Sequence, residues 1–155
     1  MLERTIARFA LFHDTLEALA PYWAPLGLRL VLAWEFWESA HMKLTGSNWF
    51  HQIQDQFPFP FNVVPPEISW TLATVFETAG AFALLVGLAT RYFALSLLVL
   101  DLVAWYAVHA GHGYNVCDNG WKLPLMYLIM LLPLLFAGPG KASIDHLIAR
   151  SYRNA

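Results

Sequence analysis

Residues 68–111 read ISWTLATVFETAGAFALLVGLATRYFALSLLVLDLVAWYAVHAG. A membrane-spanning helix needs about 20 mostly apolar residues, and this stretch supplies two such segments, at about 68–89 and 92–111. Only Thr90 and Arg91 lie between them. Because so short a connection cannot cross a bilayer, the two helices are predicted to form a tight antiparallel hairpin.

Two further stretches extend this pattern, at about 22–42 and 121–137. The whole chain is 58% hydrophobic and only 13% charged, whereas a soluble domain has roughly half apolar and a quarter charged residues. Its length of 155 residues suits one domain. The sequence therefore predicts a single all-α membrane domain, a four-transmembrane-helix bundle.

The N-terminal region differs from a signal peptide, because charged residues interrupt the place where an apolar core should lie. Apolar residues recur there at helical spacing, namely Ile6, Phe9, Phe12 and Leu16. We therefore expect residues 2–19 to form an N-terminal amphipathic helix on the membrane surface. A partly ordered polar tail is the alternative.

The connections between the four segments differ in character. Residues 43–66 contain the run Phe57-Pro58-Phe59-Pro60-Phe61, in which the prolines forbid a regular helix. The aromatic side chains favour a loop that folds back as a lid on the bundle. Residues 111–120 form a Gly/Asn loop, and a polar tail, residues 141–155, follows the last span.

Basic residues outside the spans predict the orientation, since cytoplasmic loops carry an excess of Lys and Arg. With four spans, six basic residues fall on one side: Arg4, Arg8, Arg91, Lys141, Arg150 and Arg153. The other side has only Lys43 and Lys122. We expect a multi-pass protein of the bacterial inner membrane with both termini in the cytoplasm.

At least four charged residues fall deep inside the predicted spans, where an unpaired charge costs several kcal/mol. They are Arg29, Glu35, Glu77 and Asp101. A helical rise of about 1.5 Å per residue puts Arg29 roughly 10 Å in, Asp101 about 15 Å, and both glutamates near roughly 20 Å. We expect Arg29 to pair with Glu77 or Glu35. Asp101 is expected to be neutral, because no cation except Arg29 lies at its depth.

A second polar set lies toward the outer face. Glu38 with His41, and His109 with His112, are each three residues apart, so each pair shares a helix face. Imidazole and carboxylate together suit copper, zinc or iron, which makes these four residues candidate metal ligands. The same outer cluster includes Lys43, expected at headgroup level near Glu38, together with Asp118, Asn119 and the thiol of Cys117.

Each set also has a purely structural interpretation. The buried charges can hold four helices in register, or they can form a proton or quinone site, or a metal site. The outer histidines can be ordinary residues of the membrane interface, and Cys117 can be an inert loop thiol.

Net charge and cysteine content exclude some classes of function. The formal net charge is −2, so no basic surface is available for nucleic acid. Cys117 is the single cysteine, so the chain has neither an internal disulfide nor a dithiol relay.

Several pieces of this sequence, in this order, resemble the DoxX family of small bacterial four-helix membrane proteins. The resemblance covers about residues 26–146. Its pieces are Leu28-Arg29-Leu30, Met42-Lys43-Leu44, Glu77-Thr78-Ala79-Gly80, Val86-Gly87-Leu88-Ala89-Thr90-Arg91 and Gly138-Pro139-Gly140-Lys141-Ala142-Ser143-Ile144-Asp145.

Two further pieces are similar to a subgroup that accompanies copper-binding, ribosomally made peptides. They are Phe36-Trp37-Glu38-Ser39-Ala40-His41-Met42-Lys43 and Asp118-Asn119-Gly120 before Leu123-Pro124-Leu125. The subgroup implies a setting of copper stress or copper handling at the inner membrane. Within the family, one relative is described as the membrane subunit of a thiosulfate:quinone oxidoreductase, and others are associated with redox-stress complexes. It does not decide whether this chain is an enzyme.

Three functions remain open. The first is a non-catalytic membrane partner of a redox-stress or copper-peptide system, which would bind a soluble enzyme or a peptide. The second is an oxidoreductase subunit that binds quinone among the helices. The third is a metal or metallopeptide handler at the outer face, with copper as the metal. Membrane lipid is an expected partner in all three, and small-residue helix faces suit a homodimer.

Overall fold

The computed structural model describes residues 2–154, and within them the ordered elements are helices. The long ones are α1 (Leu2–Thr45), α2 (Pro66–Val86), α3 (Thr90–Ala104), α4 (Lys122–Phe136) and α5 (Ile144–Asn154). Three short 3₁₀ turns, η1 (Phe50–Gln52), η2 (Gln54–Gln56) and η3 (Phe61–Val63), lie between α1 and α2. A π-helix, η4 (Trp105–His109), continues α3.

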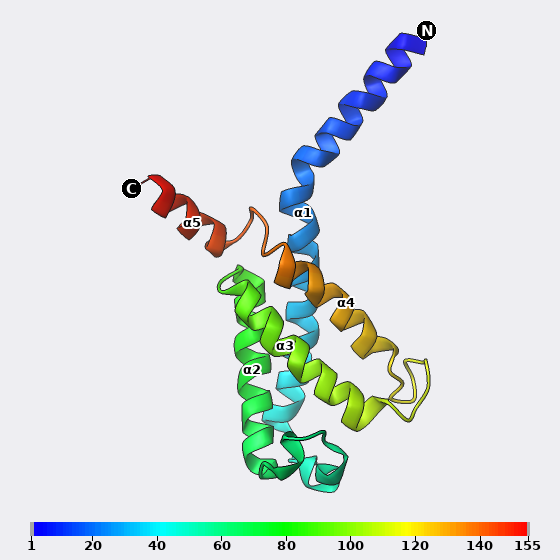
Figure 1. Ribbon diagram of the computed structural model, residues 1–155, viewed down its shortest axis with the longest axis vertical. Helices are drawn as coiled ribbons and strands as arrows, with labels where there is room; N and C mark the ends of the chain where they lie inside the picture. Colours follow the sequence, from blue (N-terminus) through cyan, green and yellow to red (C-terminus); the bar gives the residue numbers. More distant parts are fainter. Residues whose placement is uncertain (1, 155) are drawn as a thin grey trace.

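The C-terminal part of α1 packs with α2, α3 and α4 into a bundle (Figure 1). The core of this bundle is made of buried leucine, alanine and phenylalanine side chains from all four helices, with Leu32, Leu84, Leu97 and Leu131 fully buried. Gly80 lets α2 approach α3 closely, because a Cβ there would lie 2.8 Å from a methyl carbon of Leu97. A small residue on α2 therefore serves helix contact within the bundle.

Two helices are long and apolar enough to cross a membrane in the described part of the chain, Pro66–Val86 and Thr90–His109. The helix Lys122–Phe136 is apolar but shorter. All three match predicted segments within a few residues. These apolar helices suggest a membrane protein, and the all-α class is confirmed.

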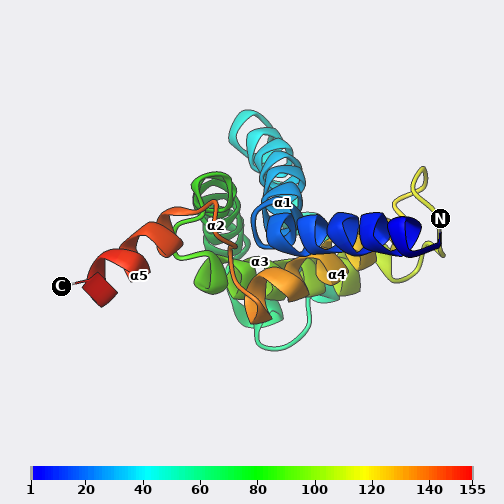
Figure 2. The same ribbon diagram turned by 90° about the horizontal axis from the view of Figure 1, so that it is seen from above.

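The N-terminal residues are helical, but they do not form a separate helix. They are the first turns of the 44-residue α1, which continues through Pro21 and Pro25. Proline removes a backbone donor and bends a helix where it does not end it. Figures 1 and 2 show the resulting change of direction, which carries the N-terminus away from the bundle.

The loop before α2 folds back onto the bundle, as its aromatic residues predict. Phe50 and Phe57 are buried, and they form a second core with Ala73 of α2 and Ala107 of η4. The ring of Phe50 meets the rings of both Phe57 and Trp70 edge-on, with centroids 5.1 Å apart in each case.

Most of the polar tail after α4 is helical and forms α5. The four residues Ile144, Leu147, Ile148 and Tyr152 follow a helical spacing that puts them on one face. All four are exposed.

Candidate functional site

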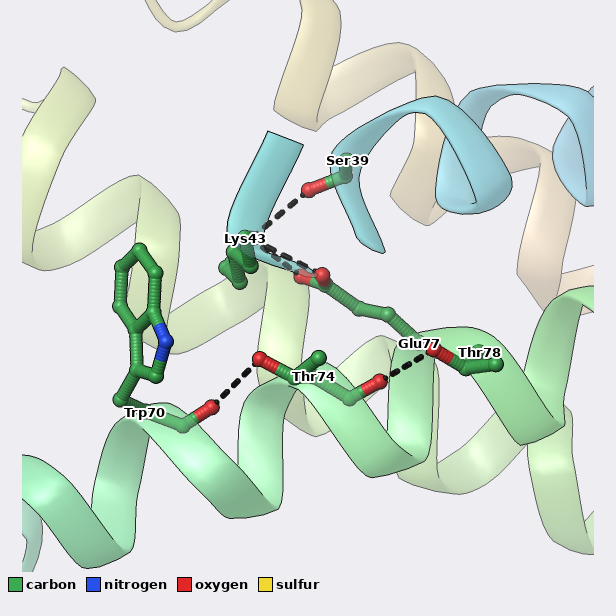
Figure 3. A network of polar contacts seen from close by, with 6 residues as sticks. All are labelled: Ser39, Lys43, Trp70, Thr74, Glu77 and Thr78. Atoms are coloured by element: carbon green, nitrogen blue, oxygen red, sulfur yellow. Dashed lines mark hydrogen bonds and ion pairs between the residues drawn. The ribbon is translucent and has the colours of Figure 1, made fainter. Parts of the chain in front are cut away.

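One buried ion pair joins α1 to α2 (Figure 3). The ammonium of Lys43 donates to both carboxylate oxygens of Glu77, at 2.9 and 3.0 Å, and to the hydroxyl of Ser39 at 2.9 Å. The two charged side chains are only 12% and 7% exposed. Because the ammonium has three N–H donors, this arrangement uses all of them.

The threonines around Glu77 take no part in this pair. The hydroxyl of Thr74 donates to the carbonyl of Trp70, and that of Thr78 donates to the carbonyl of Thr74 (Figure 3). Each threonine thus meets its own hydrogen-bonding need within α2, which leaves Lys43 as the partner of Glu77.

The position predicted for Lys43, at headgroup level near Glu38, is therefore wrong for its charged group. Lys43 lies in the last turn of α1, but its flexible four-carbon stem lets the ammonium reach back into the bundle toward Glu77. Glu38 is exposed on the same helix.

The guanidinium of Arg29 hydrogen-bonds to backbone carbonyls. Its guanidinium donates to the carbonyls of Leu84 (2.8 Å) and Leu85 (3.0 Å) near the end of α2. It also donates to those of Pro139 (3.0 Å) and Ala142 (2.7 Å) in the segment after α4. The side chain is 1% exposed. The last carbonyls of a helix lack intrahelical partners, so Arg29 caps α2 and ties it to the α4–α5 connection.

The predicted pairing of Arg29 with Glu77 or Glu35 is accordingly wrong. Glu77 is bound by Lys43, and the acid in electrostatic range of Arg29 is Asp145. An estimate of depth along the helices matches charged side chains with one another. It cannot predict the partners of Arg29, because these are backbone carbonyls.

Asp145 closes the α2–α3 hairpin from outside. Its carboxylate accepts hydrogen bonds from the backbone N–H groups of Ala89 (2.7 Å) and Thr90 (2.9 Å) at the start of α3. Its own N–H donates to the carbonyl of Gly87 at 2.9 Å. A carboxylate at a helix N-terminus is favoured by the helix dipole. Asp145 is thus an important polar residue that was not predicted as one.

Gly87 is required where these segments meet. Its φ is +71°, and a Cβ there would lie 2.5 Å from the Cβ of Ser143 and 2.8 Å from the Cζ of Arg29. The α2–α3 hairpin and the segment Gly138–Asp145 are far apart in the sequence, yet both pack against the side chain of Arg29.

A second polar group lies inside the bundle. The hydroxyl of Tyr127 on α4 donates to a carboxylate oxygen of Glu35 on α1, at 2.5 Å. Asp101 of α3 lies in electrostatic range of the same hydroxyl. Tyr127 was not among the predicted site residues. The sequence does contain one indication of its role: after Lys122, Tyr127 is the one residue of the apolar helix α4 that bears a hydroxyl group.

Asp101 differs from the other three acidic or basic residues of the buried set. It is 6% exposed, and its Oδ2 is a buried atom without a hydrogen-bond partner among the described residues. Three residues further along, α3 passes into the π-helix η4. Such π-bulges are frequent at functional sites. Among the four buried charged residues, Asp101 is therefore the one whose carboxyl group is most available to a ligand.

The structure does not gather the four proposed metal ligands. His41 is exposed and stacks against Trp37, while Glu38 and His112 are also exposed. The Nδ1 of His109 is 2.7 Å from the carbonyl oxygen of Asn119. Asp118 and Cys117 are exposed in the loop.

Among the residues described, the grouping of three or more potential metal ligands lies elsewhere, at His13, Asp14 and Glu17 on the N-terminal part of α1. All three side chains are exposed. An exposed His/Asp/Glu group on one helix face is ordinary surface chemistry without an ion present.

Comparison with known proteins adds to this geometry. Residues 24–110 match the DoxX family model. An uncharacterized protein of Haemophilus influenzae is 54% identical over 125 residues, which are 81% of this chain and 83% of the relative. A second uncharacterized protein of that organism is 35% identical over 78 residues, 48% of this chain and 58% of that protein. No solved structure matches the chain. The chain belongs to the DoxX family.

Proposed function

We propose that this DoxX protein is a four-span protein of the bacterial inner membrane with both termini in the cytoplasm. The C-terminal part of α1 would be the first span, followed by α2, α3 with η4, and α4. The support is the antiparallel packing of these helices together with the Lys and Arg residues at one end. Charged residues lower the hydropathy of α1, and internal hydrogen bonds offset that cost.

Cys117 gives a direct test of this orientation, because it is exposed in the 111–120 loop and is the only cysteine. A membrane-impermeant maleimide added to intact spheroplasts should label Cys117. The matched control is Cys117→Ser with Ser151→Cys, whose thiol lies on α5 and should react only after the membrane is broken. Labelling in the reverse order would reject the orientation.

The function proposed for this fold is that of a non-catalytic membrane partner of a soluble redox or copper-peptide system. One observation carries it: the charged groups of Arg29, Lys43, Glu77 and Glu35 are bound by groups of the chain itself. A buried charge that is already bound is part of the scaffold. The outer cluster, with the exposed Glu38 and His41, and the exposed helix α5 then remain for a partner.

The test is a native mass spectrum and a metal analysis of one sample, purified from its own bacterial membrane in mild detergent. Lipid and a co-purified soluble protein are the expected additions. Stoichiometric quinone, copper, zinc or iron would contradict a purely non-catalytic role. Copper that is lost in His41→Ala with His109→Ala would instead favour the metal-handling alternative.

A quinone-binding subunit is the second candidate, favoured by the buried Oδ2 of Asp101 near the Tyr127–Glu35 hydrogen bond. A quinone carbonyl or quinol hydroxyl would hydrogen-bond there. Quinone that co-purifies with the wild type and is lost in Tyr127→Phe or Asp101→Asn would support this candidate. Quinone content unchanged in both variants would reject the site.

A further inference from the structure

We propose that the cytoplasmic end of the bundle holds a binding site for the phosphate of one anionic phospholipid. The site is an open cavity of about 730 Å³ between the proline bend of α1, the start of α3, the α4–α5 connection and α5. This inference rests on the orientation proposed above, which sets that end at the headgroups of the inner leaflet.

The lining of the cavity is cationic. It contains three basic side chains, Arg91 from α3, Lys141 from the α4–α5 connection and Arg153 from α5, together with His146. They come from separate segments, so the charge is gathered by the fold. Basic pockets between membrane helices on the cytoplasmic side are suited to acidic lipid headgroups.

The cations keep donors available for a ligand. Arg91 donates to the carbonyl of Phe136 at 3.3 Å and lies over Gly138, yet a guanidinium has five N–H groups. The ammonium of Lys141 stands 5.4 Å from the centre of the Tyr22 ring, a cation–π contact that positions it. Its three N–H groups donate to no side chain or carbonyl among the described residues. The backbone of Lys141 is fixed as well, because its N–H donates to the carbonyl of Pro21 at 2.9 Å.

The one acid among the described lining residues, Asp145, is already occupied. Both of its oxygens accept backbone N–H groups at the start of α3. Three basic side chains against this one carboxylate leave the lining with a net positive charge. The cavity accordingly favours a lipid with a net negative charge, such as phosphatidylglycerol, over phosphatidylcholine.

The surroundings favour a lipid over free phosphate. Exposed aromatic residues ring this end of the bundle, namely Tyr22, Trp23 and Tyr92, and aromatic side chains of this kind concentrate at headgroup level. Helix α5 extends sideways from the bundle here (Figure 1). Its exposed apolar face, with Leu147 and Ile148, suits a helix that lies in the membrane surface.

The test is a lipid titration followed by native mass spectrometry on the full chain in mild detergent. The probes are phosphatidylglycerol, phosphatidylcholine and inorganic phosphate. We expect the first lipid to bind at the lowest concentration. Lys141→Gln with Arg153→Gln should weaken it by roughly tenfold to thirtyfold, at about 1 kcal/mol per cation removed.

The matched control is Arg8→Gln with Arg150→Gln, which removes the same charge from exposed positions that do not line the cavity. It should keep the wild-type affinity, as should Lys141→Arg with Arg153→Lys. Equal losses in both glutamine pairs, or no preference for the anionic lipid, would overturn the site. Displacement by inorganic phosphate at matching concentrations would assign the cavity to the free ion and overturn the lipid assignment.

This assay works in detergent and needs neither a partner nor a given orientation. Failure of lipid binding therefore leaves the maleimide and co-purification results standing. Failure of those tests, conversely, would leave a measured lipid affinity in place.

Discussion

Arg29 and Asp101 present the same physical problem in two regions of one bundle, because both are ionisable groups that are almost fully buried. At Arg29 four backbone carbonyls from two segments converge on the guanidinium. At Asp101 a buried carboxyl oxygen has no partner among the described residues. The first region is closed by its own chain, while the second keeps an unused hydrogen-bonding group. Stability should therefore depend on the first region and ligand chemistry on the second.

The largest effect is expected at Arg29. Arg29→Met keeps an unbranched side chain but leaves four carbonyls without their donor, which should cost roughly 3–5 kcal/mol of the free energy of unfolding. Thermal unfolding in detergent would measure the loss. Arg29→Lys should recover only part, because an ammonium has three N–H donors for four carbonyls and lacks the planar fork of the guanidinium. Wild-type stability in Arg29→Met would remove the basis of the comparison.

A smaller loss of stability is expected at the ion pair between Lys43 and Glu77. Lys43→Met would leave Glu77 buried without its cation, at a cost of roughly 2–3 kcal/mol. The double variant Lys43→Met with Glu77→Leu should regain most of this stability, because it removes both charges together. The two single variants and the double variant form a cycle that isolates the pair energy. A double variant as unstable as the sum of the singles would show that the two side chains do not act as a pair.

The hairpin cap should contribute less again. Asp145→Ala would remove both acceptors from the N–H groups at the start of α3, at a cost of about 1–2 kcal/mol. Asp145→Asn should lose less, since its amide oxygen still accepts one N–H. Hydrogen exchange at Ala89 and Thr90 would report the opening of this turn directly. Unchanged exchange in Asp145→Ala would mean that the cap has no role in holding the hairpin.

The two regions also differ in how far the sequence predicts them. Hydropathy locates α2, α3 and α4 within a few residues, because length and apolar content are local properties. The bonds of Arg29 are not local: they depend on carbonyls around residues 84 and 139–142, which no residue type reveals. The cap by Asp145 has the same origin, since it joins segments about 55 residues apart.

Other misses came from flexible reach and from proline. Lys43 was placed by its backbone position, but its long side chain brings the charge to Glu77. The sequence predicts a separate amphipathic helix at residues 2–19, whereas α1 bends at Pro21 and Pro25 and continues. An amphipathic spacing like that of residues 2–19 also occurs in α5. It is harder to see in the sequence, because polar residues make up most of this tail.

The smallest change in stability is expected at Asp101, and it separates the two regions most sharply. Asp101→Asn keeps the side-chain volume and removes an ionisable group that no described residue binds through Oδ2, so the free energy of unfolding should change by less than about 1 kcal/mol. Thermal unfolding beside Arg29→Met gives the comparison in one experiment. A loss as large as that of Arg29→Met would make Asp101 a scaffold residue and remove the case for a ligand. A stable variant that has lost a co-purifying quinone would place the ligand at Asp101, because the fold would be intact and only the hydrogen-bonding group altered.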